Sequence, residues 1–233
     1  HMRRLDQSLA ALHMGNPLTR EQWLEVLMKL VADNPAADQS LYLQVTRGVS
    51  ERDHAINLAT SPTVFAMSKP LPQRNLAQGV KAITLDDIRW KNCHIKAITL
   101  LPSVLLRHQA TQAGAIEAIL LREGCVTEGA ASNVFVVRDG VIKTPPCDNK
   151  LLAGITRALV LELLAQAHLP HAETRITEEE LRSADEIWIT SSTWEIVPVI
   201  RLDEKPVGTG NPGRYWQQVS TLYQHFKNEV TAI

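Results

Sequence analysis

Val126-Thr127-Glu128-Gly129-Ala130-Ala131-Ser132-Asn133-Val134-Phe135 combines a single carboxylate with a run of small side chains. A strand is predicted to follow it at residues 133–137. Small residues in a turn let a ligand come close to the backbone, and Glu128 could pair there with a protonated nitrogen. An ordinary β-turn with a solvated glutamate explains the same ten residues, so the surrounding sequence must distinguish the two interpretations.

Helical and strand-like patterns alternate on both sides of this decapeptide. Leu5, Leu9 and Leu12 recur at helical spacing, and Thr19-Arg20-Glu21-Gln22 is a capping box that opens a second helix. Strands are predicted at 41–47, 63–67, 80–84, 117–121, 133–137, 141–143, 186–190 and 197–200, and further helices at 102–113, 155–167, 178–183 and 213–229. The pattern is that of an α+β or mixed α/β protein.

Two prolines in the segment 69–75 mark the best candidate for a linker. We therefore expect a small N-terminal domain at residues 1–70 and a larger C-terminal domain at residues 71–233.

The composition excludes several classes of protein. The 233 residues include 24 Lys+Arg and 25 Asp+Glu, and 45% are hydrophobic, which is typical of globular chains. A net charge of −1 offers no electrostatic footprint for nucleic acid or a lipid surface. No apolar run approaches the about 18 residues of a membrane span, and no signal peptide is visible. The three cysteines form no CxxC motif, so we expect reduced thiols and a cytoplasmic protein.

Common nucleotide, hydrolase and metalloprotease motifs are missing from the sequence. There is no GxGxxG, no GxxxxGKS or GxxxxGKT, no HExxH and no GxSxG. The eight histidines include no pair at metal-ligand spacing with a third ligand nearby, so no metal is expected. The remaining candidates for chemistry are scattered along the chain.

Lys96 is the most unusual of these candidates, because apolar residues crowd it from Ile95 onward. Desolvation would lower its pKa and make its amine a nucleophile suited to Schiff-base chemistry. A lysine whose head reaches solvent past an apolar stem is the plainer alternative.

Three further segments could bind anions. Leu152-Ala153-Gly154-Ile155-Thr156-Arg157 opens a long apolar helix, where free backbone N–H groups can hold a phosphate. Thr190-Ser191-Ser192-Thr193 follows a strand and adds hydroxyl groups, and Arg52-Asp53-His54 could clamp a carboxylate. Each segment taken alone could equally be a cap, a turn or a polar loop.

Taken together and in order, these segments resemble the fold-type IV aminotransferases, which use pyridoxal 5′-phosphate (PLP), and most of all their D-amino-acid branch. The resemblance runs over essentially the whole chain. The segments that carry it are Tyr42-Leu43-Gln44-Val45-Thr46-Arg47-Gly48, Asp87-Ile88-Arg89-Trp90, Ile95-Lys96, Thr127-Glu128-Gly129 with Ser132-Asn133-Val134-Phe135, and Gly154-Ile155-Thr156-Arg157.

The resemblance implies a role for each candidate residue. Lys96 would form the Schiff base with PLP and then act as general base, and Glu128 would pair with the pyridine nitrogen. Arg52 and His54 would hold the substrate carboxylate, in a loop that serves the neighbouring subunit of a homodimer. The other residues implied to bind PLP are Arg4, Leu152, Ile155, Thr156, Ser191 and Ser192.

The activity implied is transamination of D-amino acids such as D-alanine with 2-oxoglutarate or pyruvate. Branched-chain L-aminotransferases, (R)-amine transaminases and aminodeoxychorismate lyase share the fold, and the Arg52-x-His54 pair argues against them. A scaffold that has lost its enzymatic function is a further alternative, against which the retained Lys96 and Glu128 argue.

The sequence departs from the family pattern at several points. Ala130 and Ala131 stand where serines are usual, and Ile56-Asn57 replaces a common Phe-Pro. The family also carries an N-terminal β-segment before the helix of Arg4, which this chain lacks, so we expect the first strands of the small domain to be missing. His1 and Met2 fit the family's own helix at this place.

Overall fold

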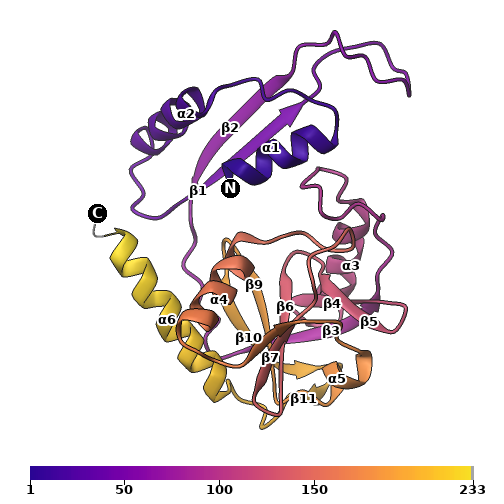
Figure 1. Cartoon of the computed structure of the whole chain (residues 1–233), viewed down its shortest axis with the longest axis vertical. Helices are drawn as coiled ribbons and strands as arrows, with labels where there is room; N and C mark the ends of the chain where they lie inside the picture. Colours follow the sequence, from indigo (N-terminus) through magenta and orange to yellow (C-terminus); the bar gives the residue numbers. More distant parts are fainter. Residues whose placement is uncertain (232–233) are drawn as a thin grey trace. The chain divides into compact units, whose positions relative to one another are not determined.

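The computed structural model describes residues 1–231 and divides into two compact units, His1–Gln73 and Arg74–Ile233. Figure 1 shows the chain coloured along its sequence, with both units labelled by element. The boundary predicted after residue 70 stays a prediction. No helix within residues 1–231 is both long and apolar enough to cross a membrane.

The N-terminal unit consists of two helices and a two-stranded antiparallel sheet. Its elements are α1 (Met2–Ala11), α2 (Arg20–Ala32), β1 (Gln39–Thr46) and β2 (Thr63–Pro70). The capping box at the start of α2 is confirmed, because the Thr19 hydroxyl accepts from the Gln22 amide and the Gln22 side chain accepts from the Thr19 amide. Strand β2 continues through Pro70, which pairs with Gln39. The predicted linker is therefore wrong at its first two residues: Pro70 is tolerated because it closes a strand at a sheet edge.

The C-terminal unit is built on one nine-stranded sheet in the order β5-β4-β3-β10-β9-β6-β7-β8, with β11 paired to β10. Strand β3 runs parallel to β4 and β10, whereas β6, β9 and β10 pair antiparallel. The strands are β3 (Val80–Asp86), β4 (Glu117–Arg122), β5 (Cys125–Gly129), β6 (Asn133–Arg138), β7 (Val141–Thr144), β8 (His171–Glu173), β9 (Glu186–Ser191), β10 (Glu195–Leu202) and β11 (Lys205–Pro206).

Helices cover this sheet on more than one side, as Figure 1 shows. Phe135 and Trp188 face helices α4 (Ile155–Gln166) and α6 (Arg214–Thr231), with their ring centroids 6.0 Å apart. The intervening residues, such as Val134 and Ile189, point to the opposite face and form a second core. This alternation follows from the period of two in a strand. The remaining helices of the unit are α3 (Leu101–Gln112), which packs on β3 and β4, and the short α5 (Glu178–Arg182).

The predicted strands and helices are all present, with shifts of a few residues at their ends. Strands β5, β8 and β11 were not predicted. The error matters most for β5, because Thr127 and Glu128 lie in a fully buried strand rather than in a turn. Only residues 130–132 form the connection between β5 and β6.

Candidate active site

Glu128 is the centre of a polar cluster inside the C-terminal unit. The residue lies near the end of β5 and is buried. The carboxylate oxygen Oε2 accepts hydrogen bonds from the Asn133 side-chain amide and the Leu152 backbone amide, both at 3.1 Å. The Asn133 amide also donates to the Leu152 carbonyl oxygen at 2.8 Å. Two residues implied by the family resemblance, Glu128 and Leu152, are thus brought together by a third, Asn133.

Arg89 balances the charge of Glu128 from the other side. Its guanidinium donates to Glu128 Oε1 and forms a bidentate pair with Asp87, in which both distances are 2.9 Å. Asp87 also accepts from the Thr127 hydroxyl at 2.9 Å and lies 3.1 Å from Arg122. The Asp87 side chain therefore fixes the plane of the guanidinium that reaches Glu128.

Burial and pairing shift the pKa values of these groups in different directions. Burial raises the pKa of Glu128 to about 7, against the opposing attraction of Arg89. Burial also works against the charge of Asp87, but its hydrogen bonds with Arg89 prevail and lower its pKa. Desolvation of Arg89 is outweighed in the same way by Asp87 and Glu128, so the pKa of the guanidinium is raised. Of the two carboxylates in this cluster, Glu128 is therefore the one whose ionised form a further cation would stabilise most.

The start of α4 lies beside this cluster. Gly154 is the N-cap of α4 and has no side chain to cap the first amides. A methyl group at this position would collide with the Asn133 side-chain oxygen, so only glycine fits. Ile155 and the buried Thr156 follow as the first two helical residues. Open amides at a helix start, next to a buried hydroxyl, suit a phosphate.

Thr190 adds a second hydroxyl on the same face of the sheet. It lies directly opposite Asn133 in the β6–β9 register, so the two side chains point to the face that α4 covers. The Thr190 side chain is 2% exposed, and its hydroxyl has no hydrogen-bond partner among residues 1–231. A buried hydroxyl that no protein group satisfies is a position for a ligand oxygen or a water molecule.

Lys96 lies in the connection between β3 and α3 and is exposed. Of the two interpretations of this lysine, its exposure fits the plainer one, a side chain that reaches solvent, and the apolar residues Ile98, Leu100 and Leu101 are themselves exposed. The first part of the connection is anchored near the polar cluster, since Cys93 and Asn149 are joined by a backbone hydrogen bond of 2.9 Å.

The other predicted residues are divided between the two units. Ser191 ends β9 and Ser192 begins the turn that follows, in the C-terminal unit. Arg4 lies half-buried on α1, where desolvation lowers its pKa, and Arg52 and His54 are exposed in the long connection between β1 and β2. These three residues belong to the N-terminal unit, whereas Glu128 belongs to the C-terminal unit.

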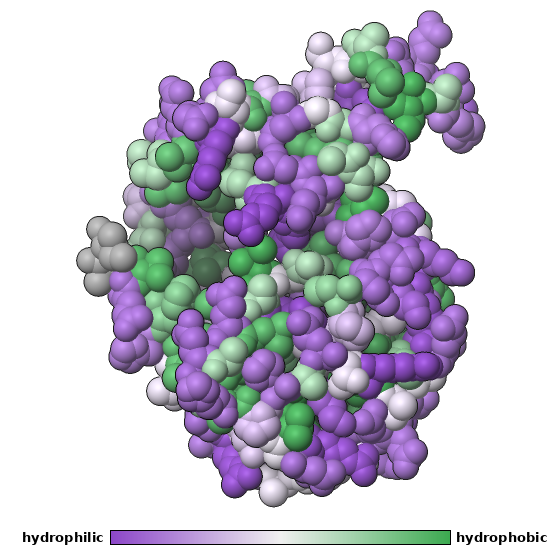
Figure 2. Space-filling model, in the orientation of Figure 1, coloured by the Kyte–Doolittle hydropathy of each residue, from purple (hydrophilic) through white to green (hydrophobic). Residues whose placement is uncertain are grey.

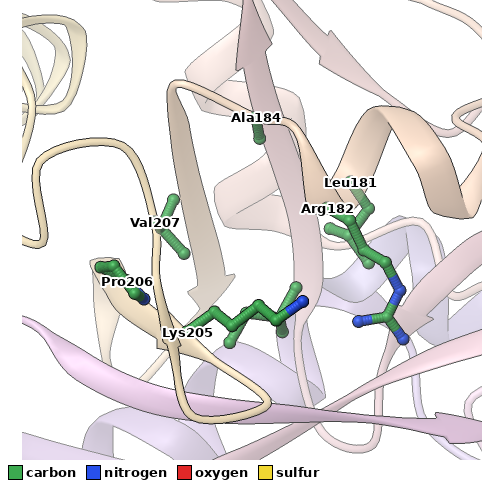
Figure 3. A pocket seen from close by; sticks show the side chains of 7 residues that line it. Leu181, Arg182, Ala184, Lys205, Pro206 and Val207 are labelled. Atoms are coloured by element: carbon green, nitrogen blue, oxygen red, sulfur yellow. The ribbon is translucent and has the colours of Figure 1, made fainter.

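The pocket drawn in Figure 3 lies elsewhere in the C-terminal unit. It is bounded by α5 and the β10–β11 hairpin, and its two cations, Arg182 and Lys205, belong to those elements. Arg182 is already paired with Glu178 and Asp203. None of the residues that line this pocket is a predicted site residue.

Sequence reasoning missed Arg89 and Asp87 as members of the site. The Asp87-x-Arg89 spacing contributed to the family resemblance, but Glu128, the partner of Arg89 on β5, lies 39 positions away, which leaves no local signal. Thr190 belonged to the candidate segment 190–193, but only Ser191 and Ser192 of that segment were expected to bind PLP.

Comparisons with known proteins identify this arrangement. The profile of the amino-transferase class IV family matches residues 1–202. The chain belongs to the class IV aminotransferases. The D-alanine aminotransferase of Bacillus licheniformis is 40% identical over 227 residues, which are 97% of this chain and 80% of that protein. The D-alanine aminotransferase of Staphylococcus aureus strain MW2 is 37% identical over 88% of this chain and 74% of its own length.

Solved structures of related enzymes share the fold. The branched-chain aminotransferase of Thermobaculum terrenum in its PLP form has a TM-score of 0.87 at 25% identity, covering 97% of this chain and 76% of that one. A 4-amino-4-deoxychorismate lyase from Legionella pneumophila, described as putative, has a TM-score of 0.86 at 21% identity, covering 97% of this chain and 84% of that one. The expected fold-type IV architecture and the expected cofactor, PLP, are confirmed.

The residues of this class IV aminotransferase fit PLP. Glu128 is a buried carboxylate whose raised pKa would fall beside a pyridinium nitrogen. The open start of α4 and the unsatisfied hydroxyl of Thr190 offer donors to a phosphate. Asn133 lies next to Glu128 and also next to the start of α4 and Thr190. The position for the pyridinium nitrogen and the position for the phosphate are therefore on either side of one side chain.

Proposed function

We propose that this enzyme transfers the amino group of D-alanine and related D-amino acids to a 2-oxo acid such as 2-oxoglutarate or pyruvate. The observation that carries the proposal is 40% identity, over 97% of the chain, to a D-alanine aminotransferase. We also infer that it works in the cytoplasm, where the three free cysteines would remain reduced.

PLP, when bound, supplies an aldehyde group that can form a Schiff base with an amine, and a ring that acts as an electron sink. Glu128 would hold the pyridine nitrogen protonated through its buried carboxylate, and Arg89 would keep that carboxylate charged. Leu152 would pack against the ring. The Thr156, Ser191 and Ser192 hydroxyls, the first amides of α4 at Ile155, and Arg4 would bind the phosphate.

Lys96 would provide both the covalent anchor and the base. Its Nζ atom would remove the proton from the substrate Cα and deliver it to the C4′ carbon of the cofactor. Removing the proton and returning it from one face would give the reaction its stereochemistry.

Arg52 and His54 would bind the substrate carboxylate. Arg52 can form two parallel hydrogen bonds with a carboxylate, and His54 can add a third donor. Both are exposed on the β1–β2 connection, which Figure 1 shows in purple beyond the ends of the two strands. An exposed pair on a projecting segment suits a role in the site of a neighbouring subunit.

The decisive experiment compares D-alanine with L-alanine, each with 2-oxoglutarate, by following pyruvate formation. We expect turnover of the D-isomer only. Arg52→Gln should raise KM for D-alanine by about 10- to 100-fold, because a hydrogen bond to a charged group is lost. The absorbance of bound PLP should not change, and Arg20→Gln on α2 provides a matched control. Turnover restricted to L-alanine would reject the proposal in favour of an L-amino-acid aminotransferase. Several structural relatives are branched-chain amino acid aminotransferases.

We propose a homodimer as the active form. Hydrophobic side chains on the β1–β2 connection face solvent on both sides of Arg52 and His54: Val49, Ile56 and Leu58 are 94%, 51% and 76% exposed. Figure 2 shows hydrophobic residues gathered on this projection, among a mostly hydrophilic surface. A second apolar group, Ile98, Leu100, Leu101, Val104 and Leu105, is exposed after Lys96. Exposed apolar groups of this kind mark interaction surfaces.

Sedimentation velocity should therefore show a dimer for the wild-type protein. Leu58→Asp should shift the population toward monomer by placing a charge in the interface, and the loss of activity should follow the monomer fraction. Val230→Asp, at an exposed apolar position of α6, is the control. A fully active wild-type monomer would contradict the dimer without affecting the proposed reaction.

A further inference from the structure

Two turns of the C-terminal unit carry or flank residues that the proposed function assigns to PLP. The turn at residues 129–132 directly follows Glu128, and the turn at residues 191–194 contains Ser191 and Ser192. They connect different pairs of strands, β5 with β6 and β9 with β10. The distance between Glu128 and the phosphate-binding serines, which must match the dimensions of PLP, therefore depends on how these turns are held.

Glu117 binds the first turn through its carboxylate. It is the first residue of β4, its side chain is fully buried, and burial raises its pKa. Its Oε2 atom accepts from the Ser132 hydroxyl at 2.9 Å and the Ala131 amide at 3.3 Å. A side chain at Gly129 would collide with Ser132, so the turn closes tightly over this carboxylate. The other oxygen accepts from the Ala118 amide at 3.0 Å.

Arg107 of α3 is the cationic partner of Glu117, with Nη1 3.7 Å from Oε2. The same guanidinium lies over the indole of Trp194, 4.5 Å from the ring centroid. Trp194 ends the second turn and is fixed there by a 3.2 Å hydrogen bond from its amide to the Ser191 hydroxyl. Arg107 thus contacts the group that holds one turn and the residue that closes the other.

We propose that Arg107 is a positioning residue that holds the 129–132 and 191–194 turns at a fixed separation, so that one PLP molecule meets Glu128 and the phosphate-binding residues together. The inference rests on the proposed binding of PLP and not on the choice of substrate. The planar guanidinium suits both contacts, because it can pair with a carboxylate at its edge while its face stacks on the indole. Arg74 also lies over Trp194, but farther, at 6.0 Å.

The test uses Arg107→Met, which keeps the length and apolar character of the side chain and removes both polar contacts. We expect the dissociation constant of PLP, measured by absorbance titration, to rise on the order of tenfold, as when a residue that orients ligands is lost. In the protein without PLP, amide hydrogen exchange should accelerate in both turns. Arg201→Met, which removes an ion pair with Glu204, is the control and should change neither quantity.

Two more variants separate positioning from general destabilisation. Arg107→Lys keeps the charge beside Glu117 and should recover part of the PLP affinity, whereas Trp194→Leu removes only the stacking and should loosen the 191–194 turn. If Arg107→Met does not fold, the proposal stands or falls on these two. PLP binding by Arg107→Met and Trp194→Leu within twofold of wild type would overturn it. Wild-type protein that binds PLP but does not use D-alanine would overturn the proposed function alone.

Discussion

Lys96→Ala should lose transamination by on the order of 10⁴-fold, the upper range for removal of a general base. The variant keeps Glu128 and the start of α4, so it should still bind PLP, but without a covalent bond. Borohydride treatment followed by mass spectrometry of peptides should find the reduced cofactor on Lys96 in the wild-type protein and on no lysine in the variant.

Lys91→Ala is the matched control for this experiment. Lys91 lies in the same connection and is also exposed, and its known contact is made by its backbone carbonyl, which accepts from Asn149 at 2.8 Å. The control should keep both the covalent cofactor and full turnover. Retained turnover in Lys96→Ala would reject Lys96 as the base, and a reduced cofactor on another lysine would identify the residue in its place.

The sequence predicted the elements of the C-terminal unit well because its central strands are short runs of β-branched and aromatic residues. Val134 and Val136 face one core, whereas Phe135 and Val137 face the other, so both faces of β6 are buried and the strand forms a continuous apolar run in the sequence. Strand β5 was not predicted because, apart from Val126, its buried residues are polar or small. Its polar residues are satisfied by partners distant in sequence, which no local pattern reveals.

The candidate site was predictable in its residue types but not in its environment. Glu128 was assigned through family resemblance, yet its raised pKa depends on burial that only the fold creates. The apolar residues after Lys96 left two interpretations open, a desolvated amine or a lysine that reaches solvent, and the exposure of these residues fits the second. The role of Arg89 could not be read from its neighbour Asp87 alone, because its other partner, Glu128, lies 39 positions away on β5.

Arg89→Gln should lower the free energy of unfolding by about 3–5 kcal/mol, the cost of leaving a buried charge without its partner. The Arg89 side chain is 8% exposed, that of Glu128 is 7% exposed, and Asp87 is fully buried beside them. Denaturant unfolding of the protein without PLP measures the loss. The double variant Arg89→Gln/Glu128→Gln should be more stable than Arg89→Gln alone, since it removes the orphaned carboxylate as well. Equal stability of the single and double variants would show that Glu128 does not depend on Arg89.

The pH dependence of stability gives an independent measure of the same pair. In the folded protein the pKa of Glu128 is raised from 4.5 to about 7, so the folded state holds a proton that the unfolded state releases. The stability contributed by that proton is fully present below about pH 4.5 and is lost as the pH rises through 7. Glu128→Gln should remove this slope, and Arg89→Gln should extend it to higher pH, because burial then acts without an opposing cation. PLP should have the opposite effect to Arg89→Gln, since a protonated ring nitrogen beside Glu128 would keep the carboxylate ionised and reduce the slope. An unchanged slope in Glu128→Gln would mean that another group binds the proton, and that the pKa of Glu128 is not raised.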